Sequence, residues 1–310
     1  MSSVTLLFPD DGRLIGGLTV TERAERAARD GGLPADRTLL LTEPVVFDAE
    51  AVRSLAAVPG TVVTAAAGLV VTDAGTTWDT VTRALERGDT VKTDATGFVA
   101  AAGDPAAAER ALWSRYCFKP SDGPVLRANR RLSRRLTLAL VRTSVSSDTV
   151  SVASFLVVAL GALLIGQGTW SATAAGGLLV QAGFVLDCVD GQMARLRLRS
   201  SRRGALIDTI LDRYADLVVI AALTVAAGGG PAEWAWGFAA GAASMLVPYI
   251  NALNADAPRR LLRRPERILL CAAAAVAGAP LAALAVIAVL GNIDAARVFY
   301  LLVRATPDGS

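Results

Sequence analysis

The chain has 310 residues, of which 53% are hydrophobic, and its mean hydropathy is +0.46. This length allows about two domains, and so apolar a composition excludes a disordered chain and a secreted disulfide scaffold. The sequence contains no histidine, which excludes histidine-dependent triads, histidine zinc sites and imidazole acid–base catalysis. The three cysteines, Cys117, Cys188 and Cys271, match no metal-ligand spacing. We therefore expect reduced thiols in an intracellular chain.

The charge divides the chain near residue 118. Residues 1–118 hold 16 acidic and 11 basic residues, a net charge of −5, whereas residues 119–310 hold 12 acidic and 20 basic residues, a net charge of +8. Arginine greatly outnumbers lysine, a bias that hints at a bacterial source. The two parts are thus expected to have different surroundings.

Residues 1–118 are predicted to form a cytoplasmic α/β domain, because short β-rich runs alternate with helical stretches. No apolar secretory segment opens the sequence. The β-rich runs are Val4 to Phe8, Thr38 to Leu41, Val45 to Phe47 and Thr61 to Thr72, and the helical stretches include Thr21 to Arg29 and Trp78 to Arg87.

Residues 119–148 are predicted to be a juxtamembrane linker that contains an amphipathic helix. From Leu126 to Val141, arginine and leucine alternate at helical spacing, as in helices that lie on anionic lipid. A solvated connector with basic flanks is the alternative.

Residues 149–304 are predicted to form a polytopic helical membrane domain. About 20 apolar residues cross the roughly 30 Å hydrocarbon core. Six stretches qualify, near 149–166, 171–190, 205–228, 232–252, 267–282 and 284–303. Only Gly278, Ala279 and Pro280 separate the last two, which leaves a tight turn or one bent unit open.

Arginine placement predicts the topology of these spans, since basic loops remain on the cytoplasmic side. Arginines cluster before the first span, between the second and third, and between the fourth and fifth, where Arg259, Arg260 and Arg263 lie. The other three connections contain no lysine or arginine. Both termini and the basic loops are therefore expected in the cytoplasm.

Carboxylates are concentrated on the second and third predicted spans. On one helix, positions i, i+3, i+4, i+7 and i+8 are Asp187, Asp190, Gly191, Ala194 and Arg195. On the next, steps of four join Gly204, Asp208, Asp212 and Asp216. Residues at these spacings share a helix face, so two pairs of carboxylates are expected to face each other.

Such a cluster at a membrane surface predicts a divalent metal site. Like charges in a poorly solvated place must be neutralised, and an all-oxygen ligand set suits Mg²⁺ or Mn²⁺. Two ions would fit a diphosphate substrate. Pairing with nearby arginines, or an ion pathway in a non-enzymatic membrane protein, is the alternative.

The spacing D-x2-D-G-x2-A-R-x8-G-x3-D-x3-D from Asp187 to Asp212 resembles the signature of the CDP-alcohol phosphatidyltransferase family. The resemblance extends over residues 119–304, including Lys119 to Gly123 before the basic helix. The segment Ser146-Ser147-Asp148 departs from the Thr-Pro-Asn that is common before the first span, which affects the nucleotide contacts expected there.

This resemblance implies transfer of a phosphoalcohol group from a CDP-alcohol, such as CDP-diacylglycerol, to a hydroxyl acceptor, with release of CMP, in phospholipid biosynthesis. By position, Asp187, Asp190, Asp208 and Asp212 would bind metal, and Asp212 would also be the general base. Gly191, Arg195 and Gly204, together with Asp187, would line the CDP site. Members are commonly homodimers.

The acceptor is expected to be a small alcohol or sugar phosphate, with inositol phosphate favoured. Arginines on the cytoplasmic side, Arg202, Arg203, Arg264 and Arg267, are candidates for binding its phosphate. Topogenic charge is the alternative for each. We expect no nucleic-acid partner. The expected location is the bacterial cytoplasmic membrane, with the active site facing the cytoplasm.

The N-terminal segment from Phe8 to Ala24 resembles the opening of the nucleotidyltransferase domain that some family members carry. A triphosphate site needs glycine and basic residues, but only Gly12 and Arg13 fit, and no lysine precedes Lys92. We therefore predict a degenerate domain. The alternative is a bifunctional cytidylyltransferase and di-myo-inositol-phosphate-phosphate synthase-like enzyme, in which Asp73 would bind metal.

Overall fold

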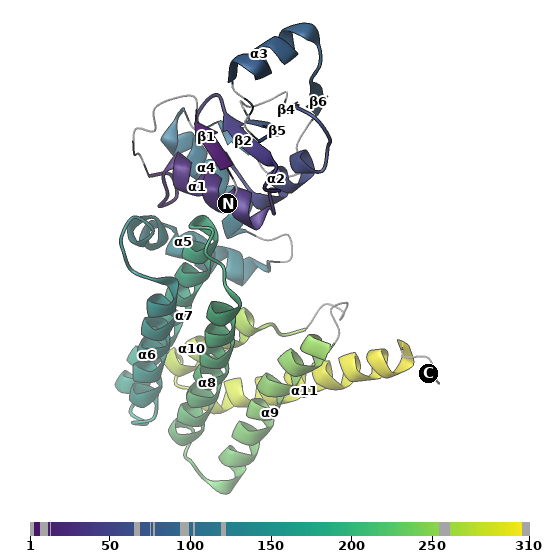
Figure 1. The fold of residues 1–310 in the computed structure, drawn as a ribbon. Helices are drawn as coiled ribbons and strands as arrows, with labels where there is room; N and C mark the ends of the chain where they lie inside the picture. The colour runs from purple at the N-terminus through teal and green to yellow at the C-terminus, as the bar shows by residue number, and fades with distance from the viewer. Residues whose placement is uncertain are drawn as a thin grey trace. The chain divides into compact units, whose positions relative to one another are not determined.

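The computed structural model describes residues 3–6, 12, 14–64, 69–74, 76, 78–93, 99–101, 103–118, 122–253 and 261–305. The chain divides into two compact units. The first comprises residues 1–121, 135–145 and 192–200, and the second comprises residues 122–134, 146–191 and 201–310. Two long helices, α5 and α7, belong in part to each unit (Figure 1).

The first unit contains the α/β fold that the sequence predicts. Its five-stranded sheet has the order β1-β2-β5-β4-β6, and β3 pairs with β7 in a separate antiparallel ladder. The strands are β1 Ser3–Leu6, β2 Arg37–Leu41, β3 Val45–Phe47, β4 Val62–Thr64, β5 Leu69–Asp73, β6 Val91–Thr93 and β7 Val99–Ala101. The helices are α1 Val20–Asp30, α2 Ala49–Ala56, α3 Trp78–Arg87 and α4 Pro105–Cys117.

The β-rich run from Thr61 to Thr72 contains two strands, β4 and β5, which pair antiparallel with Val62 opposite Val71. All five residues of β2 are buried, as are the first four of β5. These strands are therefore covered on both faces and lack the alternation of a half-exposed sheet.

Local capping fixes where the helices of this unit begin. At α1, Thr19 and Glu22 form a reciprocal capping box, each side chain accepting a hydrogen bond from the other residue's backbone N–H. At α4, the Asp104 carboxylate accepts from the Ala106 N–H, and Pro105 occupies the first turn.

Helix α5, Pro124–Leu140, occupies the predicted amphipathic segment. Its buried face is polar, with Asn129, Ser133 and Thr137 packed inside the protein, whereas Leu132 is 69% exposed and Leu136 is 42% exposed. An exposed leucine stripe beside arginines is compatible with the predicted amphipathic helix on anionic lipid, which stays a prediction.

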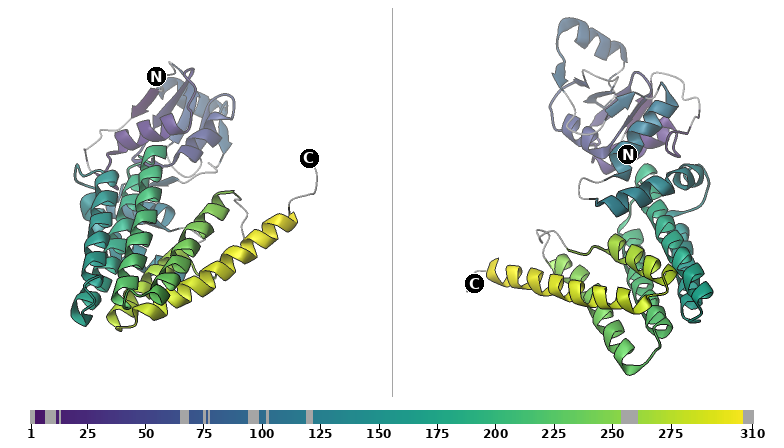
Figure 2. Two further views of the ribbon diagram at one scale, coloured as in Figure 1. Left: turned by 90° about the horizontal axis from the view of Figure 1, so that it is seen from below. Right: turned by 180° about the vertical axis from the view of Figure 1, so that it is seen from behind.

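The second unit is helical, and each predicted span contains a helix (Figure 2). These helices are α6 Ser147–Ile165, α7 Trp170–Leu196, α8 Arg202–Ala226, α9 Pro231–Leu253, α10 Arg264–Val276 and α11 Pro280–Ala305. Among the described residues, α6, α7 and α11 are long and apolar enough to cross a membrane. Helix α9 packs along α11, and α6 packs along α8.

The last two predicted spans are separate helices, so the single bent unit is wrong, as is the predicted end of the fifth stretch at residue 282. Helix α10 stops at Val276, and α11 starts at Pro280. Gly278 has a φ of +71°, which glycine adopts without strain, and proline fits the first turn of a new helix. With 13 residues, α10 extends about 20 Å.

Glycines bring α6 and α7 into close contact. A Cβ atom on Gly176 would lie 2.4 Å from the Gly161 carbonyl oxygen, and one on Gly183 would lie 2.6 Å from Val158 Cγ2. Small residues let helix backbones approach in this way within a membrane. This packing sets the position of α7 against α6.

We therefore expect Gly176→Ala to destabilise the helical unit by about 2 kcal/mol, because its new methyl group overlaps a backbone atom. Thermal unfolding of the purified protein in detergent measures this as a fall in Tm. The matched control is Gly241→Ala on α9, where a Cβ would lie at an ordinary 3.7 Å from Leu217 Cδ2. Equal Tm values for the two variants would contradict the close packing.

Candidate functional site

Three of the predicted carboxylates meet between α7 and α8. One oxygen each from Asp187, Asp208 and Asp212 can be chosen so that all three lie within 4.8 Å of one another. Helix α8 begins at a defined place because the Ser201 hydroxyl accepts from the Gly204 N–H at 3.0 Å. Asp208 and Asp212 then follow one helical turn apart, on the face that meets α7.

The fourth predicted carboxylate, Asp190, has a different set of contacts. Asp190 is buried and accepts hydrogen bonds from the Ser151 hydroxyl on α6 and from the Gly191 N–H. It is not a member of the group of three among the described residues. Ser151 thus holds Asp190 one helical turn beyond Asp187.

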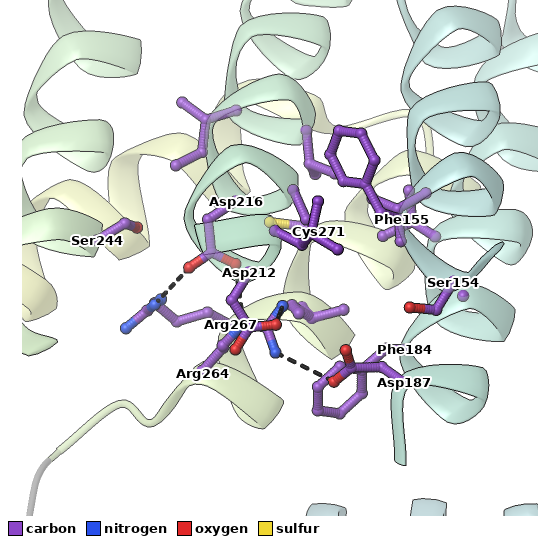
Figure 3. A pocket seen from close by; sticks show the side chains of 18 of the residues that line it. Ser154, Phe155, Phe184, Asp187, Asp212, Asp216, Ser244, Arg264, Arg267 and Cys271 are labelled. Carbon is purple, nitrogen blue, oxygen red and sulfur yellow. Dashed lines mark hydrogen bonds and ion pairs between the residues drawn. The ribbon is translucent and has the colours of Figure 1, made fainter. Parts of the chain in front are cut away.

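Arginines from α10 pair with the acidic cluster (Figure 3). The Arg264 guanidinium lies 2.8 Å from Asp212 Oδ1, 3.1 Å from Asp216 Oδ1 and 3.4 Å from Asp187 Oδ2. Arg267 lies 3.0 Å from Asp216 Oδ2. These two side chains have exposed fractions of only 16% and 5%, so their attraction to the carboxylates is weakly screened by solvent.

A proline on α9 leaves a backbone carbonyl available to accept a hydrogen bond from a further arginine. Pro248 has no N–H, so the Ser244 carbonyl, four residues earlier, loses its helical hydrogen bond. Arg213 Nη1 on α8 donates to this carbonyl at 3.2 Å and lies 3.6 Å from Asp216 Oδ2. Arg213 is thereby held beside the acidic cluster.

Three of the carboxylates line one end of a cavity between the helices of the second unit (Figure 3). Asp187, Asp212 and Asp216 form its charged wall together with Arg264 and Arg267, and Phe184 contacts the Arg264 guanidinium 5.3 Å from its ring centre. The remaining wall is apolar and includes Val158, Val180, Val219, Ile220 and Ile287. The cavity therefore joins a charged region to an apolar one.

The charges of this cluster fit a divalent cation. The five carboxylates of Asp187, Asp190, Asp208, Asp212 and Asp216 face three guanidinium groups, those of Arg213, Arg264 and Arg267. The group of three offers only oxygen atoms as ligands. Hard divalent cations such as Mg²⁺ and Mn²⁺ prefer this donor chemistry.

The predicted CDP-site residues fall in both units. Gly191 follows Asp190 on α7, and a Cβ on Gly204 would lie 3.3 Å from Asp148 Oδ1, so glycine lets α8 approach the start of α6. Arg195 belongs to the first unit, where its Nε donates to the Tyr116 carbonyl at 2.7 Å.

The predicted acceptor arginines separate into two pairs. Arg264 and Arg267 line the cavity, whereas Arg202 and Arg203 are exposed on the first turn of α8. Several residues that the sequence singled out lie outside the described residues, namely Arg259, Arg260, Phe8 to Asp11, Arg13 and Lys119 to Ser121.

Sequence reasoning missed Ser151, Arg213 and Phe184 at this site. The sequence does hold one signal for Ser151, since Ser147, Ser151 and Ser154 recur at helical spacing in an otherwise apolar span. Arg213 follows Asp212 within the acidic motif, but its partner depends on Pro248, which comes from a distant helix. Phe184 looks like any apolar residue of a membrane helix.

Comparison with known proteins finds several relatives with related names. A "Bifunctional IPC transferase and DIPP synthase" of Rubrobacter xylanophilus is 42% identical over 193 residues, 59% of this chain and 43% of that protein. A phosphatidylinositol phosphate synthase of Mycobacteroides abscessus is 31% identical over 163 residues, 47% of this chain and 69% of that protein.

A solved structure shares the fold. The Mycobacterium tuberculosis phosphatidylinositol phosphate synthase, crystallised with CDP-DAG bound, matches with a TM-score of 0.50 and 22% identity. The match covers 57% of this chain and 96% of that one. A second crystal structure of that protein contains manganese and citrate.

The matches to the two relatives below cover less than half of each relative's length. The chain spans 43% of the length of the Rubrobacter relative and 42% of the Aquifex aeolicus relative with the same name. The sequence model of the CDP-alcohol phosphatidyltransferase family matches residues 145–301, just over half of the 310-residue chain and the region that contains all five clustered aspartates. The chain therefore belongs to the CDP-alcohol phosphatidyltransferase family.

Proposed function

We propose that this chain is a membrane transferase that moves a phosphoalcohol group from a CDP-alcohol, CDP-diacylglycerol being the favoured donor, to a hydroxyl acceptor. The observation that carries the proposal is the meeting of Asp187, Asp208 and Asp212 oxygens within 4.8 Å, inside the family motif. Relatives named as archaetidylinositol phosphate synthase and phosphatidylinositol phosphate synthase support an inositol phosphate acceptor.

The reaction would be a displacement at phosphorus. The acceptor oxygen forms a bond to the phosphorus that carries the donor alcohol, and the bond from that phosphorus to the bridging oxygen breaks, so that CMP leaves with the electron pair. The acceptor proton passes to a carboxylate of Asp212, which acts as general base. With no histidine in the chain, a carboxylate is the group best suited to this role.

Asp187, Asp190, Asp208 and Asp212 are proposed to hold Mg²⁺ or Mn²⁺, in one or two sites. The cation would offset the charge of the diphosphate while CMP departs. The chain's own contribution is to fix the carboxylates, Asp190 through Ser151 and Asp212 through Arg264. The manganese in the Mycobacterium tuberculosis relative supports this choice of ion.

The nucleotide and acceptor would bind at opposite sides of these carboxylates. Gly191 and Gly204 leave room for the cytidine diphosphate beside the helix backbones, and Arg195 is the proposed cationic partner. Arg264 and Arg267, which line the cavity, are the stronger candidates for the acceptor phosphate. Arg202 and Arg203, exposed at the start of α8, are the second pair of candidates.

We propose that all six helices α6 to α11 lie in the bacterial cytoplasmic membrane, with the active site and residues 1–118 on the cytoplasmic side, in a homodimer. Helix α8 combines a long apolar segment with Asp212, Arg213 and Asp216, which pair with one another or with α10 rather than with lipid. Loop arginines support the orientation.

Residues 1–118 are proposed to lack nucleotidyltransferase activity. Gly16 and Gly17, from the segment that resembles a nucleotide site, form a tight turn against protein atoms. Asp73, the metal ligand of the bifunctional alternative, has a 72% exposed side chain 3.9 Å from Arg37. These contacts support a structural role for residues 1–118 rather than a catalytic one.

Replacing Asp212 by asparagine should lower kcat for CMP release from CDP-diacylglycerol and inositol phosphate by about 100-fold or more, the usual contribution of a general base. The assay follows CMP in detergent with Mn²⁺ supplied. Glu233→Gln on α9 is the control, because this acid lies in the same unit outside the cluster. If Asp212→Asn keeps wild-type activity, the proposed base is wrong.

Replacing Arg264 by methionine should raise KM for the acceptor phosphate by about tenfold, the loss expected for one or two charge-assisted hydrogen bonds. Mn²⁺ affinity should rise, because Arg264 no longer competes for Asp187 and Asp212. Initial rates and Mn²⁺ titration measure the two effects, and exposed Arg203→Met should change each less. An unaltered acceptor KM would argue against the assigned phosphate contact.

The purified wild-type chain should not release pyrophosphate from CTP and inositol phosphate, because its α/β unit is proposed to be inactive. Pyrophosphate is measured beside CMP release in the same preparation, which shows that the protein is intact. Pyrophosphate release that disappears in Asp73→Ala would overturn this expectation and make the chain bifunctional.

A further inference from the structure

The turn Ile15 to Leu18 seats the start of α1 against helix ends of the first unit. The N–H of Ile15 donates to the Leu18 carbonyl at 2.8 Å, and the φ angles of Gly16 and Gly17 are +59° and +79°. A Cβ on Gly17 would lie 2.1 Å from the Val141 carbonyl oxygen, just past the end of α5. Glycine is required here both by conformation and by this close approach.

This turn leads into Arg23, a buried arginine on α1. Arg23 is 1% exposed, and its Nη2 donates to the Leu196 carbonyl at 2.7 Å and to the Ile15 carbonyl at 2.9 Å. Leu196 is the last residue of α7. The final carbonyls of a helix have no partner within the helix and carry partial negative charge, so a guanidinium there satisfies both needs.

Two neighbouring contacts hold the same segment. Arg26 Nη1 on α1 donates to the Arg197 carbonyl at 2.6 Å, and Arg195 Nε donates to the Tyr116 carbonyl on α4 at 2.7 Å. Arg197 in turn donates to the Leu140 carbonyl at the end of α5. The end of α7 and the residues that follow it, 192–200 together, are thus attached to both α1 and α4 within the first unit.

Arg23 contributes directional hydrogen bonds at this position rather than apolar packing. Burial lowers the pKa of Arg23 to about 10, and its Nε and Nη1 atoms have no hydrogen-bond partner among the described residues. An apolar side chain of similar length would avoid the desolvation cost of the guanidinium. What the guanidinium adds at this position is its hydrogen bonds to the last carbonyl of α7 and to the Ile15 carbonyl of the preceding turn.

We propose that Arg23 is a positioning residue for the carboxylates of α7, and that the α/β domain fixes the end of that helix. The inference depends on the transferase function proposed above. A helix transmits displacement of its end along its axis, and Asp190 and Asp187 lie about 9 and 14 Å from Leu196 at 1.5 Å per residue. Small misplacements of reacting groups reduce catalysis strongly.

The test compares arginine variants of the full chain. Arg23→Met should lower both kcat for CMP release and Mn²⁺ affinity, measured by electron paramagnetic resonance, by about tenfold, as loss of an orienting contact does at metal sites. Arg23→Lys should recover most of both, since only Nη2 donates. The matched control is Arg53→Met, because Arg53 contacts the last carbonyl of α1, that of Asp30, at 3.4 Å.

Wild-type kcat and Mn²⁺ affinity in folded Arg23→Met would overturn the inference, as would an equal loss in Arg53→Met. If Arg23→Met does not fold, as judged by circular dichroism, Arg26→Met serves the same comparison at a more exposed site, and its wild-type behaviour would overturn the proposal. Failure of the proposed function is distinguishable, because the wild-type chain itself would then release no CMP.

Discussion

Negative charge inside an apolar helical bundle is the constraint on which this structure depends. Carboxylates in such surroundings lose the solvation of water, so each must be neutralised or paired. Three guanidinium groups surround Asp216, and Arg264 extends this pairing to Asp212 and Asp187. Arg264 stands in the first turn of α10, where the helix dipole disfavours a cation, so the carboxylates are what stabilise its position. The proposed divalent cation would supply further positive charge beside these carboxylates.

The helix packing places these charges where they can meet. Glycine contacts bring α7 close to α6, which lets Ser151 reach Asp190, and Gly204 lets the start of α8 approach Asp148. Pro248 removes one backbone hydrogen bond from α9, and the Ser244 carbonyl that it frees holds Arg213. Glycine and proline, which weaken isolated helices, therefore help to orient polar side chains in this protein.

The sequence predicts the parts of this protein whose signal is local. Spacing within one helix identifies the faces of α7 and α8, and apolar length identifies the helices of the second unit. It fails where the outcome depends on contacts between distant segments. The pairing of Arg213 with Ser244 crosses two helices, and the separation of Asp190 from the other carboxylates depends on a hydroxyl 39 residues away. Arg195 shows the same limit, because its partner is a backbone carbonyl of α4.

In the N-terminal domain, a segment that resembles the opening of a nucleotidyltransferase makes contacts of a different kind. Glycines in a segment that resembles a nucleotide loop form a turn packed against Val141, and the arginine that follows binds the end of a helix. Exposed backbone N–H groups and nearby cations are what a phosphate needs. Here Arg23 is 1% exposed and its one donating nitrogen already binds carbonyl oxygens, so it has no surface to offer a nucleotide. Glycine and arginine bind phosphate in other proteins. Here the arginine binds the last carbonyl of α7 instead, and this hydrogen bond connects the α/β fold to the helix that carries Asp187 and Asp190.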